Sequence, residues 1–348
     1  MEGLRGFAVF LVFLVHYATL VQPWVTPQGG VAATLDALHR IGNAGVDLFF
    51  VLSGFLIYGH LIASPQPFGR YIARRVQRIY PAFLAVFSVY VVLSFLRTSD
   101  SKLPDGDVAT IIYLVQNLLL LPGLLPIEPL ITVAWSLSYE MVYYLVMPGA
   151  IAVLALRSRS SGWRITFFAA STLVALAVFA VAGGSVRLTM FLAGVLLYET
   201  LPRGRAPGSA AAWIALVLCL AALLVPMPGP AGQTLRTALL FTGFFVLCYS
   251  CFGQPRQTVA RAFRWTPMRW LGNMSYSYYL IHGLTLKALF LALGKACPPG
   301  STGDLGVWLI VPAFALTLAP SALLFLWVER PFSLRPKWAR APRTAAAS

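Results

Sequence analysis

Apolar runs of about twenty residues recur along most of this 348-residue chain. A run of that length, wound as an α-helix at about 1.5 Å per residue, matches the roughly 30 Å hydrocarbon core of a bilayer. Only helices and closed barrels satisfy every backbone polar group inside lipid. The runs therefore predict an all-α fold, a polytopic membrane helix bundle. The composition agrees, since only 11% of the residues are charged, whereas a soluble domain carries about a quarter.

We expect about ten transmembrane helices. They are predicted at residues 6–22, 44–62, 80–96, 133–156, 165–182, 187–201, 210–226, 236–252, 273–293 and 306–328.

One further apolar run, at 109–125, differs from the others because prolines lie within it and just after it: Pro122, Pro126 and Pro129. Proline removes a helical hydrogen bond and clashes with the preceding turn. Counting this run as a span would also place every later basic loop on the opposite side from Arg70. We therefore expect residues 109–132 to form a re-entrant or interfacial segment.

The formal net charge of +15 is interpreted as a sign of topology. Lys and Arg gather in cytoplasmic loops of membrane proteins, and with ten spans most of the 26 Lys and Arg residues fall on one side. We expect a multi-pass protein of a bacterial cell membrane with both termini cytoplasmic. Residues 1–333 form one transmembrane domain in this interpretation, and 334–348 form a disordered basic tail. Nucleic acid is not an expected partner.

The four cysteines do not indicate a metal site. Cys248 and Cys251 form a CxxC inside an apolar run, and Cys219 and Cys297 stand alone. Without a second cysteine pair or a nearby histidine, small core residues are the favoured interpretation.

Three ionisable residues are expected at similar depth in the outer half of the bundle: His16, Asp47 and Glu140. Each lies within about 10 Å of the outer end of its predicted span at 1.5 Å per residue. A histidine beside a carboxylate is a suitable general base, because the carboxylate fixes the tautomer and stabilises the imidazolium. The alternative is that each residue only bonds a neighbouring helix. Asp47 is the favoured partner of His16, and Glu140, close to Trp135, is equally suited to binding an acceptor.

A second polar layer is expected at the cytoplasmic side, with Arg5, Arg75 and Arg78 as its cations and Glu329 beside them. Arg75 and Arg78 share a helical face by their i, i+3 spacing. The planar guanidinium fork suits phosphate, although an isolated basic flank of a span is the alternative. Arg5 and His16 share one face of the first helix, roughly 16 Å apart. This spacing suggests a long charged ligand held at Arg5, with its reactive end at His16.

Two further residues are weaker candidates. His282, mid-span in SYSYYLIHG, either lines the same cavity or packs in the core. Ser53 lacks the flanking glycines of a nucleophile elbow, so a serine esterase is not favoured.

Six motifs occur in this order: LRGFAVFLVFLVHY, GVDLFFVLSGFLI, RYIARRVQRIYP, WSLSYEMVYYL, SYSYYLIHG and VERPF. Together they resemble the integral-membrane acyltransferase-3 family, which O-acylates bacterial polysaccharides, peptidoglycan, Nod factors and macrolides. Glu2 departs from the family, which usually has Asp there.

The resemblance implies acyl-CoA as a co-substrate, no permanently bound cofactor, and a hydroxyl acceptor on a glycan or glycosylated metabolite. It implies His16 as base or proton carrier, with Arg5, Arg75 and Arg78 near the CoA phosphates. Glu329 matches the family's terminal glutamate motif.

The alternative function is a transporter or flippase of a lipid-linked sugar, which buried charges would also suit. It predicts inverted repeats and matching broken helices. The sequence shows neither clearly, so an O-acyltransferase of acetyl or short acyl groups is favoured.

Overall fold

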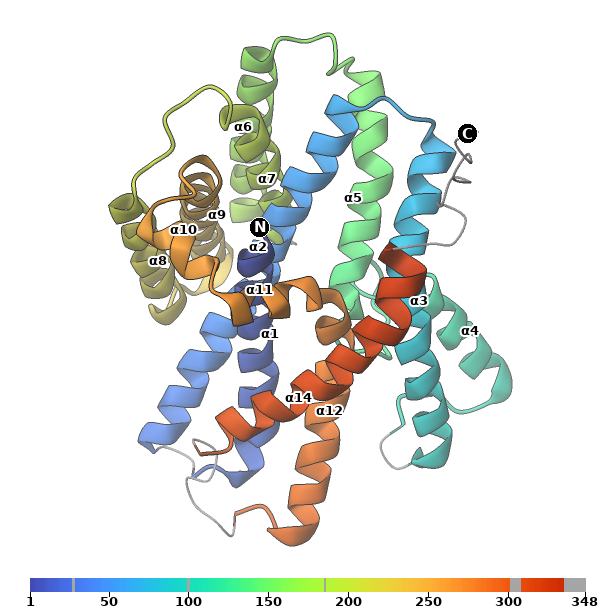
Figure 1. The fold of residues 1–348 in the computed structure, drawn as a ribbon. Helices are drawn as coiled ribbons and strands as arrows, with labels where there is room; N and C mark the ends of the chain where they lie inside the picture. The colour runs from blue at the N-terminus through green and yellow to red at the C-terminus, as the bar shows by residue number, and fades with distance from the viewer. Residues whose placement is uncertain (27–28, 99–100, 185, 301–307, 335–348) are drawn as a thin grey trace, which may run out of the picture.

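The computed structural model describes residues 1–26, 29–98, 101–184, 186–300 and 308–334. Within these ranges the regular structure is helical and no β-strand is found, as Figure 1 shows. The prediction of an all-α membrane bundle is confirmed. The predicted tail at 334–348 lies, from residue 335 on, outside the described residues.

Among the described residues, seven helices have the length and hydropathy needed to cross a membrane. They are α1 (Glu2–Val21, followed by η1, Gln22–Trp24), α2 (Gly30–Ala63), α3 (Phe68–Leu96), α6 (Ser161–Ala182), α9 (Gly229–Gly253), α12 (Ser275–Ala296) and α14 (Ile310–Leu324, continued by the π-helical η4, Phe325–Leu334).

Three other helices coincide with the remaining predicted spans, namely α5 (Ala134–Val153), α7 (Thr189–Thr200, preceded by η3, Val186–Leu188) and α8 (Ser209–Leu224). With only 12 residues, α7 is about 18 Å long and too short to cross the bilayer core alone. Most of its residues are buried inside the bundle. The short helices α10 (Thr258–Phe263) and α11 (Thr266–Asn273) connect α9 to α12.

The expected non-spanning segment contains α4 (Asp107–Leu118), which has 12 residues and is followed by irregular chain. The Asn117 side chain folds this chain back, since it accepts from the Leu130 amide at 2.7 Å and donates to the Tyr113 carbonyl at 3.1 Å. In Figure 1 the end of α3 and the start of α5 lie at the same end of the bundle. Residues 109–132 therefore do not form one continuous helix, and their re-entrant or interfacial position stays a prediction.

Two helices begin much earlier than hydropathy predicted. Helix α2 starts at Gly30, where residue 44 was expected, and α3 starts at Phe68, where residue 80 was expected. The added turns carry polar and basic residues, which a helix tolerates but which lower the hydropathy of the segment. Hydropathy marks only the lipid-compatible part of such a helix.

Helix α1 lies at the centre of the bundle, against α2, α11 and α12. Glycine permits these approaches: a Cβ on Gly45 would lie 2.4 Å from the Ala8 carbonyl oxygen, and one on Gly272 would lie 1.8 Å from that of Glu2. Small residues at helix crossings let backbones meet closely in membranes. The side chains of Arg5 and His16 are thereby fixed relative to their neighbours.

Candidate functional site

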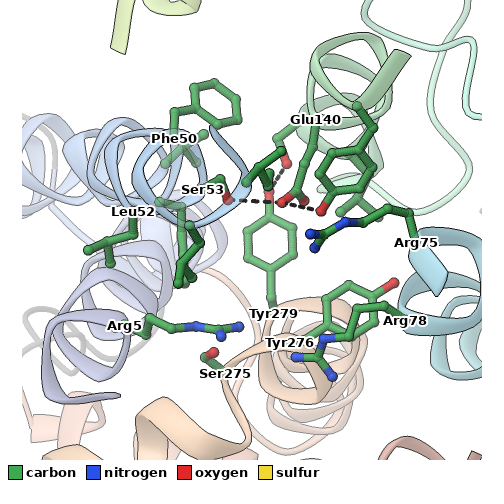
Figure 2. A pocket seen from close by; sticks show the side chains of 17 residues that line it. Arg5, Phe50, Leu52, Ser53, Arg75, Arg78, Glu140, Ser275, Tyr276 and Tyr279 are labelled. Carbon is green, nitrogen blue, oxygen red and sulfur yellow. Dashed lines mark hydrogen bonds between the residues drawn. The ribbon is translucent and has the colours of Figure 1, made fainter. Parts of the chain in front are cut away.

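The half of the bundle nearest the N-terminus contains a cavity of about 200 Å³ between α1, α2, α3, α5 and α12. We call it the arginine cavity, because Arg5, Arg75 and Arg78 point into it from two helices (Figure 2). Glu140 and Ser53 also line it. The structure thus brings together five of the candidate residues.

The buried Glu329 holds Arg78 in place. One carboxylate oxygen lies 2.6 Å from Nη1 of Arg78. The other accepts from the Ser277 amide at 3.1 Å and from its hydroxyl at 2.5 Å. Arg75 lies over the rings of Tyr71 and Tyr144, 5.3 and 5.1 Å from their centroids. Such contacts restrict both guanidinium groups to the cavity.

Glu140 is bound by neutral donors. Its Oε1 accepts from the Ser53 hydroxyl at 2.9 Å and from the Tyr144 hydroxyl at 2.7 Å. The half-buried Arg5 side chain has no hydrogen bond or ion pair within the described part of the chain. Three guanidinium groups face two carboxylates around the cavity, so the cavity retains a net positive charge. An anion such as phosphate would complement it.

His16 lies in a second cavity, which we call the His16 chamber. It has a volume of about 640 Å³ and is lined by α1, α3, α12 and residues 130–133. The His16 ring meets the His282 ring edge to face, with centroids 5.0 Å apart. His282 is fully buried, and its Nδ1 lies 2.9 Å from the Tyr278 carbonyl. Because a carbonyl only accepts, this contact places a proton on Nδ1.

The structure does not bring His16, Asp47 and Glu140 together. Asp47 lines a third cavity of about 430 Å³, here called the polar cavity, together with Trp135. There Asp47 lies 3.4 Å from Nε of Arg187. The similar depth predicted for these residues therefore did not make them neighbours. The expected His16–carboxylate pairing is replaced by the contact between His16 and His282, because His16 faces α12.

Tyr279 lies between the arginine cavity and the His16 chamber. Its side chain lines the arginine cavity, and its hydroxyl lies 2.6 Å from that of Ser136. The same hydroxyl donates to the carbonyl of Val133 at 3.0 Å, and Val133 lines the chamber. The Tyr279 ring is also 6.3 Å from that of His282. Sequence reasoning did not single out Tyr279, although it lies three residues before His282.

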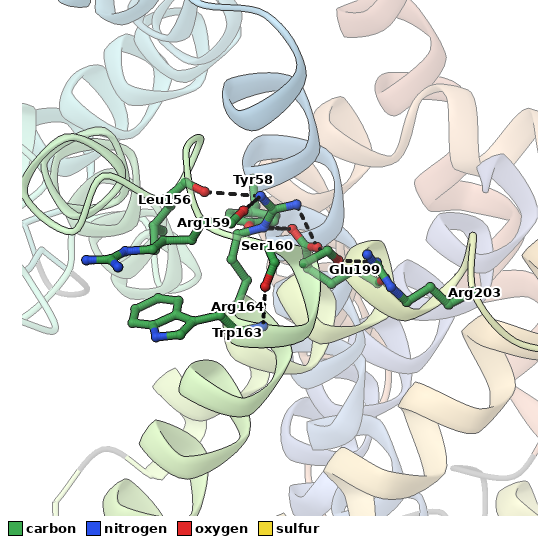
Figure 3. A network of polar contacts seen from close by, with 9 residues as sticks. Tyr58, Leu156, Arg159, Ser160, Trp163, Arg164, Glu199 and Arg203 are labelled. Carbon is green, nitrogen blue, oxygen red and sulfur yellow. Dashed lines mark hydrogen bonds and ion pairs between the residues drawn. The ribbon is translucent and has the colours of Figure 1, made fainter.

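A separate polar network surrounds Glu199 on α7 (Figure 3). Glu199 accepts from Tyr58 at 2.6 Å and from Arg164 at 2.7 and 3.0 Å. It also accepts from Ser161, to which Arg203 donates. Sequence reasoning missed this network, because its members are scattered over 145 positions between Tyr58 and Arg203. Since the carboxylate is fully occupied, the network is best explained as a tie between α2, α6 and α7.

A helical membrane bundle with a cationic cavity at one end and a histidine chamber nearer the other is suited to binding an extended anionic ligand. Residues 1–326 match the acyltransferase-3 family, described as an acyltransferase domain. The match covers most of the chain, and the chain belongs to this family.

Three relatives have informative names. The chain is 28% identical to the acyltransferase MdmB of Streptomyces mycarofaciens, over 93% of this chain and 86% of the relative. It is 24% identical to the peptidoglycan O-acetyltransferase OatA of Listeria monocytogenes, over 95% of this chain. It is 26% identical to the exopolysaccharide production protein ExoZ of Rhizobium meliloti, over 74% of this chain and 82% of the relative. The chain spans about half the length of OatA, 55%. No solved structure matches the chain significantly.

Proposed function

We propose that this protein is an acyl-CoA-dependent O-acyltransferase of the membrane. It would move an acetyl or other short acyl group to a hydroxyl of a glycan or glycosylated metabolite. The observation that carries the proposal is Arg5, which has no hydrogen bond or ion pair among the described residues, in a net positive cavity and on the same helix as His16. Family membership and the names of the relatives support the same reaction class.

The spacing of the two cavities suits acyl-CoA. Arg5 and His16 are separated by eleven residues of α1, or about 16 Å along the axis. An extended pantetheine arm spans roughly 15–20 Å by ordinary bond dimensions. Phosphates bound by the arginines would therefore leave the thioester near His16. Tyr279 lies on this route, so its ring has to turn aside as the arm enters.

His16 would act as the general base. It takes the proton of the acceptor hydroxyl while the hydroxyl oxygen attacks the thioester carbonyl carbon. The carbon–sulfur bond then breaks, and the CoA thiolate leaves with the proton that His16 received. General bases of this kind contribute about 10²–10⁴ in rate, and fixing both reactants in place contributes further. His282, which touches His16, would position its ring.

The arginines are expected to govern donor affinity. Replacing Arg5, Arg75 or Arg78 by Ala should weaken acetyl-CoA binding by roughly 1.5–3 kcal/mol each, the range for hydrogen bonds to charged groups. Added salt should also weaken binding by the parent. Equilibrium binding of radiolabelled acetyl-CoA to the purified protein measures both effects.

Arg74→Ala is the matched control. Arg74 is exposed and adjoins Arg75, and among the described residues its side chain donates only to the Gln66 side chain, at 3.3 Å. The Arg74→Ala variant removes one positive charge from α3, the helix of Arg75 and Arg78, and should leave the affinity for acetyl-CoA unchanged. Parent-like binding in all three cavity variants would contradict the proposed donor site. Sugar movement across the membrane without acyl-CoA would instead support the transporter alternative.

The basic loops are proposed to face the cytoplasm, which supplies acyl-CoA, and the His16 chamber to open toward the other side. Single cysteines replacing the exposed Arg159 and Arg205 should then label only from the cytoplasmic side, and one replacing the exposed Asp105 only from outside. Cys251 and Cys297 are changed to Ser for this experiment, because they are the partly accessible native cysteines. Labelling of Arg159 and Asp105 positions from the same side would contradict this orientation.

A further inference from the structure

The Lys and Arg residues at the end of the bundle opposite the basic loops all line one of two cavities. The polar cavity has Arg40, Arg187 and Arg236, and the His16 chamber has Arg97, Lys102, Lys287 and Lys295. Topology disfavours cations in this half of a membrane protein. Each of these cations should therefore be stabilised either by a contact within the protein or by a bound anion.

The cations of the polar cavity have such a reason in the fold. Arg40 donates to the carbonyl of Leu224 at 3.3 Å, and Arg236 donates to that of Ala222 at 3.1 Å. Both carbonyls belong to the last turn of α8, whose C-terminal end attracts positive charge. Arg187 pairs with Asp47. These contacts account for all three arginines without a ligand.

Two cations of the His16 chamber have no such contact. Neither Lys287 nor Lys295 has a hydrogen bond or ion pair to any residue that the structure describes. Lys295 is exposed and lies in the last turn of α12, where the helix dipole favours a cation. Lys287 is therefore the cation of this chamber for which the fold gives no reason. Lys102, by contrast, pairs with Glu128 at 3.1 Å and donates to the Pro129 carbonyl at 2.8 Å. Lys287 is half-buried. A half-buried ammonium without a partner at membrane depth is costly, and such residues mark substrate pathways.

The walls around these lysines are apolar. Along α12 the chamber face carries Leu280, Leu284, Lys287, Leu291 and Lys295. The spacing of three or four residues keeps them on one stripe of the helix. Leucine and isoleucine from α1, α3 and residues 130–131 complete the wall. The chamber thus combines an apolar surface with a cationic side, which suits an amphipathic anion.

We infer that the acceptor bound in the His16 chamber is an anionic glycolipid, a sugar joined through phosphate to a lipid chain. Its phosphate lies against the half-buried Lys287, the exposed Lys295 adds positive charge farther along α12, its chain follows the apolar wall, and a sugar hydroxyl reaches His16. Lys287 is five residues beyond His282, or about 7–8 Å along the helix axis, and the His282 ring lies 5.0 Å from the ring of the base His16. This separation leaves room for a sugar ring between the phosphate and His16. This inference rests on the proposed function, because it names the acceptor of the same reaction.

Binding of three probes to the full chain in nanodiscs of zwitterionic lipid tests the inference. The probes are decyl glucosyl phosphate, the neutral decyl glucoside and the chain-free glucose 1-phosphate. The parent should bind decyl glucosyl phosphate at least tenfold tighter than either of the others. The double variant Lys287→Gln/Lys295→Gln should bind both decyl probes alike. Arg40→Gln is the matched control, because it removes a cation from the same end of the bundle and should keep the preference.

Acetyl-CoA binding by the same samples separates this inference from the proposed function. Equal affinity of the parent for both decyl probes overturns the anionic acceptor, and equal affinity for glucose 1-phosphate overturns its lipid part. A preference that survives in the double lysine variant overturns the assignment to Lys287 and Lys295. Each of these results leaves the acyltransferase proposal intact if acetyl-CoA still binds. Loss of acetyl-CoA binding by the parent would overturn the proposed function itself.

Discussion

Replacing His16 by Ala is expected to lower acyl transfer at least about a hundredfold, the lower range for a general base. Acetyl-CoA binding should persist, because the proposed phosphate contacts are with Arg5 and its neighbours in a different cavity. The loss should therefore fall on kcat, with little change in donor affinity. Transfer of radiolabelled acetyl groups by purified protein, measured beside equilibrium binding of acetyl-CoA, gives both quantities.

His39→Ala is the control for this experiment. His39 is exposed on α2, so its removal deletes an imidazole without opening the chamber. Transfer by His39→Ala should match the parent. Near-normal turnover in His16→Ala would remove His16 from the chemistry. An equal loss of acetyl-CoA binding and of transfer would assign it a structural role.

The helices were largely predictable, because membrane insertion is decided by local hydropathy. Each predicted span coincides with a helix, and the proline-containing segment at 109–132 is not a continuous span. The starts of α2 and α3 were wrong because their first turns project polar residues beyond the apolar run. A hydropathy scale reports only the apolar part of a helix, so it does not detect turns that continue beyond that part.

The arginine cavity was also foreseeable. Arg75 and Arg78 share a face through their spacing, and Arg5 lies at the same end of its own helix. Charge pattern and helical period were enough to group them. The aromatic residues of the arginine cavity were not foreseeable. Tyr276 and Tyr279 line the cavity because α12 packs against α1.

The neighbour of His16 was not predictable from depth alone. Depth fixes one coordinate along the membrane normal, while contact also depends on which face a helix turns to which partner. Asp47 turns toward Arg187, 140 residues later in the chain, and His16 turns toward His282. Both pairings depend on helix packing between distant segments, which hydropathy and spacing do not encode.

Replacing Glu329 by Leu is expected to destabilise the protein by about 3–5 kcal/mol, the usual effect of removing one partner of a buried ion pair. Glu329 is fully buried and satisfies both Arg78 and Ser277. Arg78→Met should be comparably harmful, because it leaves the buried carboxylate without its cation. The midpoint of thermal unfolding in detergent reports both. The ion pair between Lys102 and Glu128 offers a control, because the Glu128 side chain is 63% exposed. Glu128→Leu should lower the free energy of unfolding by at most about 1 kcal/mol.

The double variant Arg78→Met/Glu329→Leu separates stability from donor binding. Two apolar side chains of similar size relieve the unpaired charge, so much of the lost stability should return, as it does when buried ion pairs are replaced whole. Acetyl-CoA affinity should not return, because the phosphate would still lack one guanidinium. Recovery of both properties would show that Arg78 serves only Glu329 and is not part of the donor site. Recovery of stability alone is the result that the arginine cavity predicts.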